Sequence, residues 1–167
     1  MLGNEELREE LSRMGISQAE DRADYLIVGY DTSLDYAKMT KACDLVRSGL
    51  PYIATHPDAN CPTEEGFAPD IGAIIAFIEV SAGRKPDVIL GKPYPGIVRE
   101  ALERIALSPG ELAMAGDRLY TDIATGANFS ILSILVLTGE TQAHDIQQSE
   151  VRPDFVVERL SALIDYL

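Results

Sequence analysis

Short apolar runs alternate with amphipathic segments along most of the chain, and this alternation restricts the possible folds more than any other feature. Strands are expected near residues 25–29, 51–55, 88–90, 112–115, 132–137 and 154–157. Helices are expected near residues 5–14, 34–47, 71–81, 96–106, 119–127 and 159–166. Such alternation predicts an α/β fold with a mostly parallel sheet, whose ligand sites lie at the carboxyl ends of the strands. Residues 83–86 interrupt the pattern, so we predict two parts, 1–86 and 87–167.

The charge and composition argue against several classes of partner. The 167 residues are 46% hydrophobic, which is enough for a buried core, and they carry a formal net charge of −13. This charge argues against nucleic acid and anionic membranes as partners, because both attract clustered Lys and Arg. The two cysteines make neither a disulfide framework nor a four-ligand zinc site, so we expect a cytoplasmic protein.

The segment Ala113–Asp122 carries the strongest local signal for chemistry. Its apolar strand runs into Gly-Asp and then into the first turn of a helix, which places Asp117 and Asp122 at one strand end. Mg²⁺ is a hard cation that commonly takes one or two protein carboxylates beside a substrate phosphate. The structural alternative is that Asp117 caps the helix and Asp122 complements its dipole. Taken alone, the segment slightly favours that alternative.

A lysine follows the preceding expected strand, in Gly91-Lys92-Pro93. Pro93 suits the first turn of a helix, which leaves Lys92 at the carboxyl end of the strand. Its ammonium group could neutralise a carboxylate and a phosphoryl oxygen together. A lysine at such a position is more often solvated surface, so Lys92 gains weight mainly in combination with Asp117.

The polar segment 56–69 is predicted to be a loop, and polar loops after strands often bind ligands. His56, Asp58 and Cys61 lie close together in the sequence, but their spacing matches no standard zinc pattern. A loop that faces a substrate is the better interpretation. A turn-rich connection in which Asp58 satisfies backbone groups carries comparable weight.

Taken together, these motifs resemble a known enzyme family. Gly91–Pro93, Gly116–Asp122 and Val136–Gly139 resemble the third and fourth motifs of haloacid dehalogenase-like phosphatases. The pattern Thr-x-Pro-Asp followed by Pro-Thr-Glu-x-Gly, within Ala54–Gly66, resembles the large inserted cap of one subgroup. That subgroup contains p-nitrophenyl phosphatases, phosphoglycolate phosphatases and NagD-like nucleotidases. The resemblance implies a cap subdomain up to residue 86, followed by the C-terminal half of a Rossmann-like core with a parallel sheet.

The resemblance also implies a chemistry and a set of roles. Enzymes of this family hydrolyse small phosphate monoesters through an aspartyl-phosphate and depend on Mg²⁺. Lys92 would be the catalytic lysine that orients the nucleophile and the phosphate. Asp117 would bind Mg²⁺, and Asp122 would support the metal or its waters. Four residues of the cap loop would contact the substrate, a small phosphorylated metabolite: Thr55, His56, Asp58 and Asn60.

The sequence departs from the family pattern in one large respect. The family begins with a strand that ends Asp-x-Asp, and no Asp-x-Asp occurs in these 167 residues. We do not assign Asp31 as the nucleophile, because the family has a similar Gly-x-Asp inside its cap. Met1-Leu2-Gly3 resembles the end of a cap strand, so we expect a chain that is truncated at its N-terminus. His56 stands where relatives often have Asn, and Ser130 stands where Gly is usual.

These observations predict a phosphatase domain that lacks its nucleophile segment. The alternative is a non-catalytic cap and half-core that binds a ligand or partner. A receiver-like signalling domain would need an acidic cluster on the first strand, which residues 25–31 hardly provide. Loss of the nucleophile strand would leave an unpaired edge beside the strand that ends at Asp117, so we also expect association with a second copy or with the missing segment.

Overall fold

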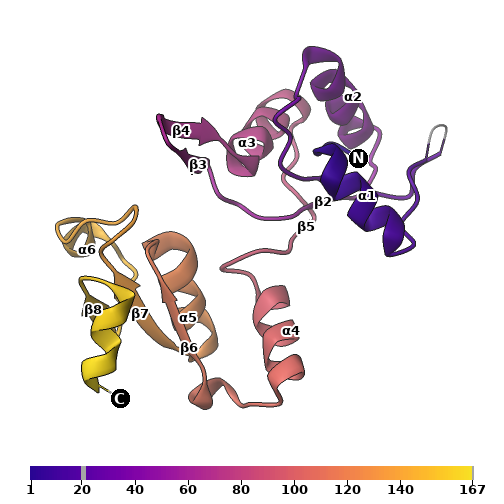
Figure 1. The fold of residues 1–167 in the computed structure, drawn as a ribbon. Helices are drawn as coiled ribbons and strands as arrows, with labels where there is room; N and C mark the ends of the chain where they lie inside the picture. Colours follow the sequence, from indigo (N-terminus) through magenta and orange to yellow (C-terminus); the bar gives the residue numbers. More distant parts are fainter. Residues whose placement is uncertain (20–21, 167) are drawn as a thin grey trace. The chain divides into compact units, whose positions relative to one another are not determined.

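The chain forms two compact units in the computed structural model, which describes residues 1–19 and 22–166. The first unit is Met1–Leu90 and the second is Gly91–Leu167 (Figure 1). Both contain a parallel sheet with helices, so the α/β prediction is confirmed. Among the described residues, none of the helices combines the length and the hydrophobicity that crossing a bilayer requires.

The first unit is built on a three-stranded parallel sheet. Its strands are β1 (Leu26–Val28), β2 (Tyr52–Ala54) and β5 (Val88–Ile89), in the order β1-β2-β5. Its helices are α1 (Glu5–Arg13), α2 (Tyr36–Arg47) and α3 (Ile71–Ala82). The Asp35 and Asp70 side chains cap α2 and α3, and Gly83 ends α3 in a left-handed conformation with φ 74°. Such caps satisfy backbone groups that would otherwise lack partners at the helix ends.

A continuous core lies between this sheet and its helices. Its buried side chains are Leu2, Leu26, Val28, Ala42, Cys43, Val46, Tyr52, Ala54, Ile71, Ile74 and Ile78. The Tyr52 hydroxyl donates a hydrogen bond to the Arg84 carbonyl at 3.2 Å. Burial raises the pKa of Tyr52 to about 12. The aromatic ring thus fills the core while its polar end keeps a partner.

The segment after β2 contains a β-hairpin, so the prediction of an irregular loop was wrong for this part. Strands β3 (Asn60–Thr63) and β4 (Gly66–Pro69) pair in antiparallel register, with Asn60 opposite Pro69. The prolines favoured a loop in the sequence, but a two-stranded ribbon has free edges on which missing N–H groups cost nothing. The turn uses Gly66 at φ 139°.

Strand β5 belongs to the first unit. It pairs with β2, and the break between the units falls after Leu90. We had placed the boundary before residue 87 and given this strand to the second part. The difference arises because the sequence order of strands does not reveal their partners. The interpretation of the two parts as cap and half-core stays a prediction.

The second unit has a parallel sheet of order β6-β7-β8, formed by β6 (Ala113–Gly116), β7 (Leu132–Val136) and β8 (Phe155–Val157). Its α-helices are α4 (Pro95–Ile105), α5 (Ala124–Phe129) and α6 (Asp145–Gln148). Two 3₁₀ segments, η1 (Pro109–Glu111) and η3 (Leu160–Tyr166), and a π-helical turn, η2 (Leu119–Ile123), complete it. Among the described strands, β6 pairs only with β7 and is therefore an edge.

Candidate active site

Lys92 and Asp122 form an ion pair in the second unit. The Asp122 side chain is 5% exposed and that of Lys92 is 38% exposed. Asp122 Oδ1 accepts from the lysine, and its Oδ2 accepts a hydrogen bond from the Arg118 backbone N–H at 3.1 Å. A carboxylate this deeply buried needs such partners, because an unpaired charge there would be costly. The two residues are 30 positions apart in the sequence, and the fold brings them together.

Asp122 lies on the π-helical turn η2, which directly follows the end of β6 and Asp117. Helical spacing had predicted an α-helix from residue 119. The backbone N–H groups of Asp122 and Ile123 both donate to the Arg118 carbonyl, at 3.0 and 3.1 Å. Single π-turns are rare and occur often at functional sites.

Asp117 is held by the segment that follows β7. Its Oδ2 accepts a hydrogen bond from the Glu140 backbone N–H at 2.7 Å, and its carbonyl accepts one from the Thr141 N–H at 3.1 Å. An ion pair between Arg118 and Glu140, at 2.8 Å, ties the same two segments together. Within the described part of the chain, the other carboxylate oxygen of Asp117 accepts no hydrogen bond. The Asp117 carboxylate is therefore held in place through one oxygen, while its other oxygen can bind a cation.

Two glycines leave room for these carboxylates. A Cβ atom added to Gly116 would overlap the Asp122 carboxylate, and one added to Gly139 would overlap that of Asp117. The Gly-Asp and Thr-Gly motifs thus need glycine because a carboxylate lies too close to the backbone for a side chain at either position. This packing explains in physical terms why the motifs have these residues at these positions.

The donors and acceptors that remain define what this site could bind. Among the described residues, Asp122 is the single hydrogen-bond acceptor of the Lys92 ammonium group, which has three N–H donors. The remaining donors can reach an anion. The free oxygen of Asp117 suits a hard cation such as Mg²⁺, which keeps most of its waters. The donor set therefore fits a cation and a phosphate bound side by side, with Asp122 engaged by Lys92.

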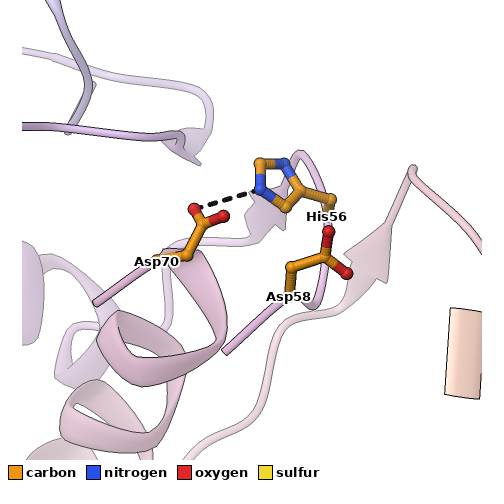
Figure 2. Close-up of side chains that lie close together, drawn as sticks. All are labelled: His56, Asp58 and Asp70. Carbon is orange, nitrogen blue, oxygen red and sulfur yellow. Dashed lines mark hydrogen bonds and ion pairs between the residues drawn. The ribbon is translucent and has the colours of Figure 1, made fainter. Parts of the chain in front are cut away.

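The predicted substrate loop lies in the first unit, and Figure 2 shows two of its residues, His56 and Asp58, together with Asp70. His56 Nε2 lies 3.1 Å from Asp70 Oδ1, and Thr55 Oγ1 lies 3.2 Å from His56 Nδ1. Ligand atoms of His56, Asp58 and Asp70 all lie within 4.8 Å of one another. Asn60 begins β3 and is exposed. The structure thus groups Thr55, His56 and Asp58, with Asn60 beside them on the hairpin.

Sequence reasoning missed Asp70 and considered Cys61 in its place. Cys61 is absent from the group within 4.8 Å, and its thiol donates to the neighbouring Pro62 carbonyl at 3.7 Å. Asp70 joins His56 because the hairpin returns the chain to its starting point, and the Asp70 N–H donates to the Ala59 carbonyl at 2.9 Å. The available signal was an aspartate directly before an apolar helical run, which marks a helix N-cap.

Asp31 is occupied by structural contacts. Its buried carboxylate accepts hydrogen bonds from the backbone and side chain of Ser33, at 2.9 and 2.7 Å, and from Lys38 at 3.0 Å. Burial acts to raise the pKa of Asp31, but the hydrogen bonds from Ser33 and Lys38 outweigh it, so the pKa lies below its ordinary value. Lys38 also donates to the Ser33 carbonyl and hydroxyl oxygens. These contacts agree with leaving Asp31 out of the candidate catalytic residues.

The chain is similar in sequence and structure to several phosphatases. A sequence model of the HAD-hydrolase-like family matches residues 89–163. An acid sugar phosphatase of Staphylococcus epidermidis is 38% identical over 165 residues, which are 98% of this chain and 63% of the relative. Among solved structures, the 4-nitrophenylphosphatase of Thermotoga maritima is 47% identical with a TM-score of 0.92. NagD of Escherichia coli K-12 is 36% identical with a TM-score of 0.83.

The matches extend over nearly all of this chain and over part of each relative. The alignments cover 98% of this chain with the T. maritima enzyme and 95% with NagD, but 62% of either structure. The chain thus spans somewhat less than two thirds of the length of these relatives.

Proposed function

Because the chain belongs to the haloacid dehalogenase-like hydrolases, we propose that it carries the lysine and Mg²⁺ part of a phosphatase that hydrolyses small phosphate monoesters. The observation that supports this most strongly is the Lys92–Asp122 ion pair beside Asp117. Lys92 keeps N–H donors for a phosphate, and Asp117 keeps a carboxylate oxygen for a cation.

Lys92 would bind a phosphoryl oxygen and orient the attacking carboxylate. Phosphoryl transfer depends mainly on positioning and charge stabilisation, and a fixed ammonium group supplies both. Asp122 would act as a positioning residue, since its buried carboxylate holds Lys92 in place. Any contribution of Asp122 to the metal would pass through bound waters, because both of its oxygens already accept hydrogen bonds.

Asp117 would hold Mg²⁺ through the oxygen that Glu140 leaves free. When bound, Mg²⁺ supplies positive charge against the phosphate oxygens and lowers the cost of bringing a carboxylate close to them. The Glu140 N–H keeps the Asp117 carboxylate oriented, and Gly139 keeps the space beside it open.

The covalent steps need a nucleophile, and no Asp-x-Asp occurs in this sequence. In the proposed reaction a carboxylate oxygen attacks phosphorus, the ester P–O bond breaks, and a second carboxylic acid gives its proton to the leaving alcohol. Water then attacks the aspartyl-phosphate, which releases inorganic phosphate and restores the carboxylate. The attacking carboxylate would come from residues outside this sequence.

We expect three further properties of the whole protein. The loop with Thr55, His56, Asp58 and Asn60 would contact the non-phosphate part of the substrate. The free edge of β6 would pair with another strand, from the segment that carries the nucleophile or from a second copy. A cytoplasmic location fits the two free cysteines, Cys43 and Cys61.

The test is Mg²⁺-dependent hydrolysis of p-nitrophenyl phosphate by three proteins. These are the 167-residue chain, the chain extended by the residues that its gene encodes upstream, and the extended chain with Asp117→Ala. We expect activity in the extended chain alone. Asp145→Ala in the extended chain is the matched control, since Asp145 is a partly exposed aspartate at the start of α6.

Two outcomes would overturn parts of the proposal. Turnover by the 167-residue chain that is lost with Asp117→Ala would place the nucleophile within this sequence, and Asp31 would be substituted next. Silence of both the short and the extended chains would favour the alternative, a non-catalytic module that binds a ligand.

A further inference from the structure

The first unit contains a second group of ligand-type side chains, formed by His56, Asp58 and Asp70. Figure 2 shows the three side chains gathered between the loop after β2 and the start of α3. His56 Nε2 lies 3.1 Å from Asp70 Oδ1, and one ligand atom of each of the three residues lies within 4.8 Å of the other two. Two ligands bound at about 2.1 Å to one tetrahedral ion lie roughly 3.4 Å apart. A shared ion would therefore need small side-chain movements only.

The backbone around these residues is fixed independently of any ligand. The Gly72 N–H donates to the Asp58 carbonyl at 2.7 Å, and the Asp70 N–H donates to the Ala59 carbonyl at 2.9 Å. A Cβ atom on Gly72 would overlap the Pro57 carbonyl oxygen, so the loop is packed directly on α3. The closed hairpin thereby fixes the backbone of Asp58 and Asp70 close to His56.

The imidazole of His56 is oriented by its neighbour. Thr55 Oγ1 lies 3.2 Å from Nδ1, so the threonine hydroxyl can accept a hydrogen bond from Nδ1–H, and in that tautomer the unprotonated Nε2 can bind an ion next to Asp70. Metal-binding histidines usually donate their second ring N–H to such an oxygen, which fixes the tautomer. The contact with Thr55 is thus of the kind that supports a metal ligand.

Asp70 can serve the helix and an ion at once. Its Oδ1 accepts from the Ile71 N–H at 2.7 Å and caps α3, while Oδ2 accepts no hydrogen bond from the described residues. The positive end of the helix dipole opposes a cation at this place. Two carboxylates offset this, since together they supply the charge that neutralises a divalent ion.

We propose that His56, Asp58 and Asp70 form a binding site for a divalent first-row transition metal ion, with Zn²⁺ as the expected occupant. Imidazole selects such ions over Mg²⁺ and Ca²⁺, which prefer oxygen ligands. Three protein ligands leave a position open for water or a substrate oxygen. If the loop contacts the substrate, which rests on the proposed function, the ion would become part of the substrate contact surface.

The test measures Co²⁺ and Zn²⁺ binding by the untagged, chelator-treated 167-residue chain. Bound Co²⁺ is read from its visible absorption bands, and Zn²⁺ is read by its competition with Co²⁺. We expect one ion per chain, and we expect His56→Asn, Asp58→Asn and Asp70→Asn each to weaken binding by about ten-fold or more. Asp70→Asn keeps an amide oxygen for the helix cap, so it separates ion binding from loss of the fold.

Two controls make the result specific. His144→Asn removes the other histidine of the chain, which also lies 3.1 Å from an aspartate, Asp145, but on an exposed surface. Asp117→Asn removes the carboxylate proposed for Mg²⁺. Neither should change the Co²⁺ affinity. Binding that is unchanged in His56→Asn, or that is lost with His144→Asn or Asp117→Asn, would overturn the proposal. Metal binding is measured without hydrolysis. A negative result would therefore overturn the metal site and would not bear on the proposed phosphatase activity, which the p-nitrophenyl phosphate assay tests.

Discussion

The two candidate sites both contain aspartates held by backbone hydrogen bonds, and they differ in the basic side chain beside these aspartates. Each gathers two aspartates and holds an aspartate carboxylate with backbone N–H groups, from Glu140 and Arg118 in one unit and from Ile71 in the other. In the second unit a lysine neutralises Asp122. In the first unit a histidine accompanies Asp58 and Asp70.

This difference in one side chain predicts different ligands. A permanent ammonium group with free N–H donors favours an anion beside the cation, as a phosphate ester with Mg²⁺ requires. An imidazole that can be neutral leaves the two carboxylates to be balanced by the bound ion itself. A pair of aspartates therefore does not determine the ligand by itself, because the side chain beside them decides which charge is still needed.

Substitution of Lys92 should give the largest change in stability. Lys92→Met leaves the Asp122 carboxylate buried without its cation, and we expect a loss of about 2–4 kcal/mol in the free energy of unfolding. Arg104→Met is the matched control, because its ion pair with Glu100 is exposed and worth less than about 0.5 kcal/mol. Urea unfolding of both variants measures the difference. Equal losses would mean that the buried pair contributes no more than a surface pair.

Substitution of Gly72 should destabilise the first unit and disturb its candidate metal site. Gly72→Ala forces a methyl group against backbone atoms of Pro57 and Asp58, and we expect a loss of about 1–3 kcal/mol together with weaker Co²⁺ binding. Gly110→Ala meets no atom within 4 Å and should be neutral. Hydrogen exchange of residues 56–72 locates the effect. An unperturbed loop in Gly72→Ala would contradict the packing described.

The Asp31–Lys38 pair should behave as a structural counterpart of Lys92–Asp122. The pKa of Asp31 is lowered in the folded protein, so its contribution to stability is present above the unfolded pKa and is lost as the pH falls through the folded one. Asp31→Asn should flatten the acid limb of stability against pH below about pH 4. Thermal unfolding at a series of pH values tests this. An unchanged acid limb would mean that other carboxylates control it.

Substitution of Thr121 should give the smallest change in stability, and this change should be a gain. Its hydroxyl oxygen is buried and has no hydrogen-bond partner among the described residues. Thr121→Val replaces this hydroxyl with a methyl group of similar size, and we expect no loss and a gain of up to about 1 kcal/mol. Thr125→Val is the contrasting variant, because the Thr125 hydroxyl donates to the Thr121 carbonyl at 2.7 Å. A larger loss in Thr121→Val than in Thr125→Val would reveal a partner for Thr121.

Most of the fold followed from sequence because apolar periodicity and caps are local properties. The alternation of strands and helices predicted the parallel sheets, whereas the close approach of carboxylates to Gly116 and Gly139 came from the structure. Ser130 was expected to take on a turn that glycine makes easily, and it adopts a left-handed φ of 55°. For the sheets and for Ser130, neighbouring residues in the sequence carried the information.

The features that the sequence did not predict depend on contacts between residues that are distant in the chain. The pairing of Asn60 with Pro69 decides that Asp70 joins His56, and no local pattern indicates that pairing. The π-turn at Leu119–Ile123 has five residues, which is too short for apolar periodicity to distinguish it from an α-helix. The roles of Lys92, Asp117 and Asp122 rest on their contacts and stay predictions.

The most direct measurement is a residue-resolved NMR titration of the 167-residue chain, first with Mg²⁺ and inorganic phosphate and then with Zn²⁺. We expect Mg²⁺ with phosphate to shift the amide resonances of residues 116–122 and 139–141, and Zn²⁺ to shift those of residues 55–60 and 70–72. Weak binding suffices for this readout. Zn²⁺ acting first on residues 116–122, or Mg²⁺ with phosphate acting only on the loop of the first unit, would contradict the assignment of the two sites.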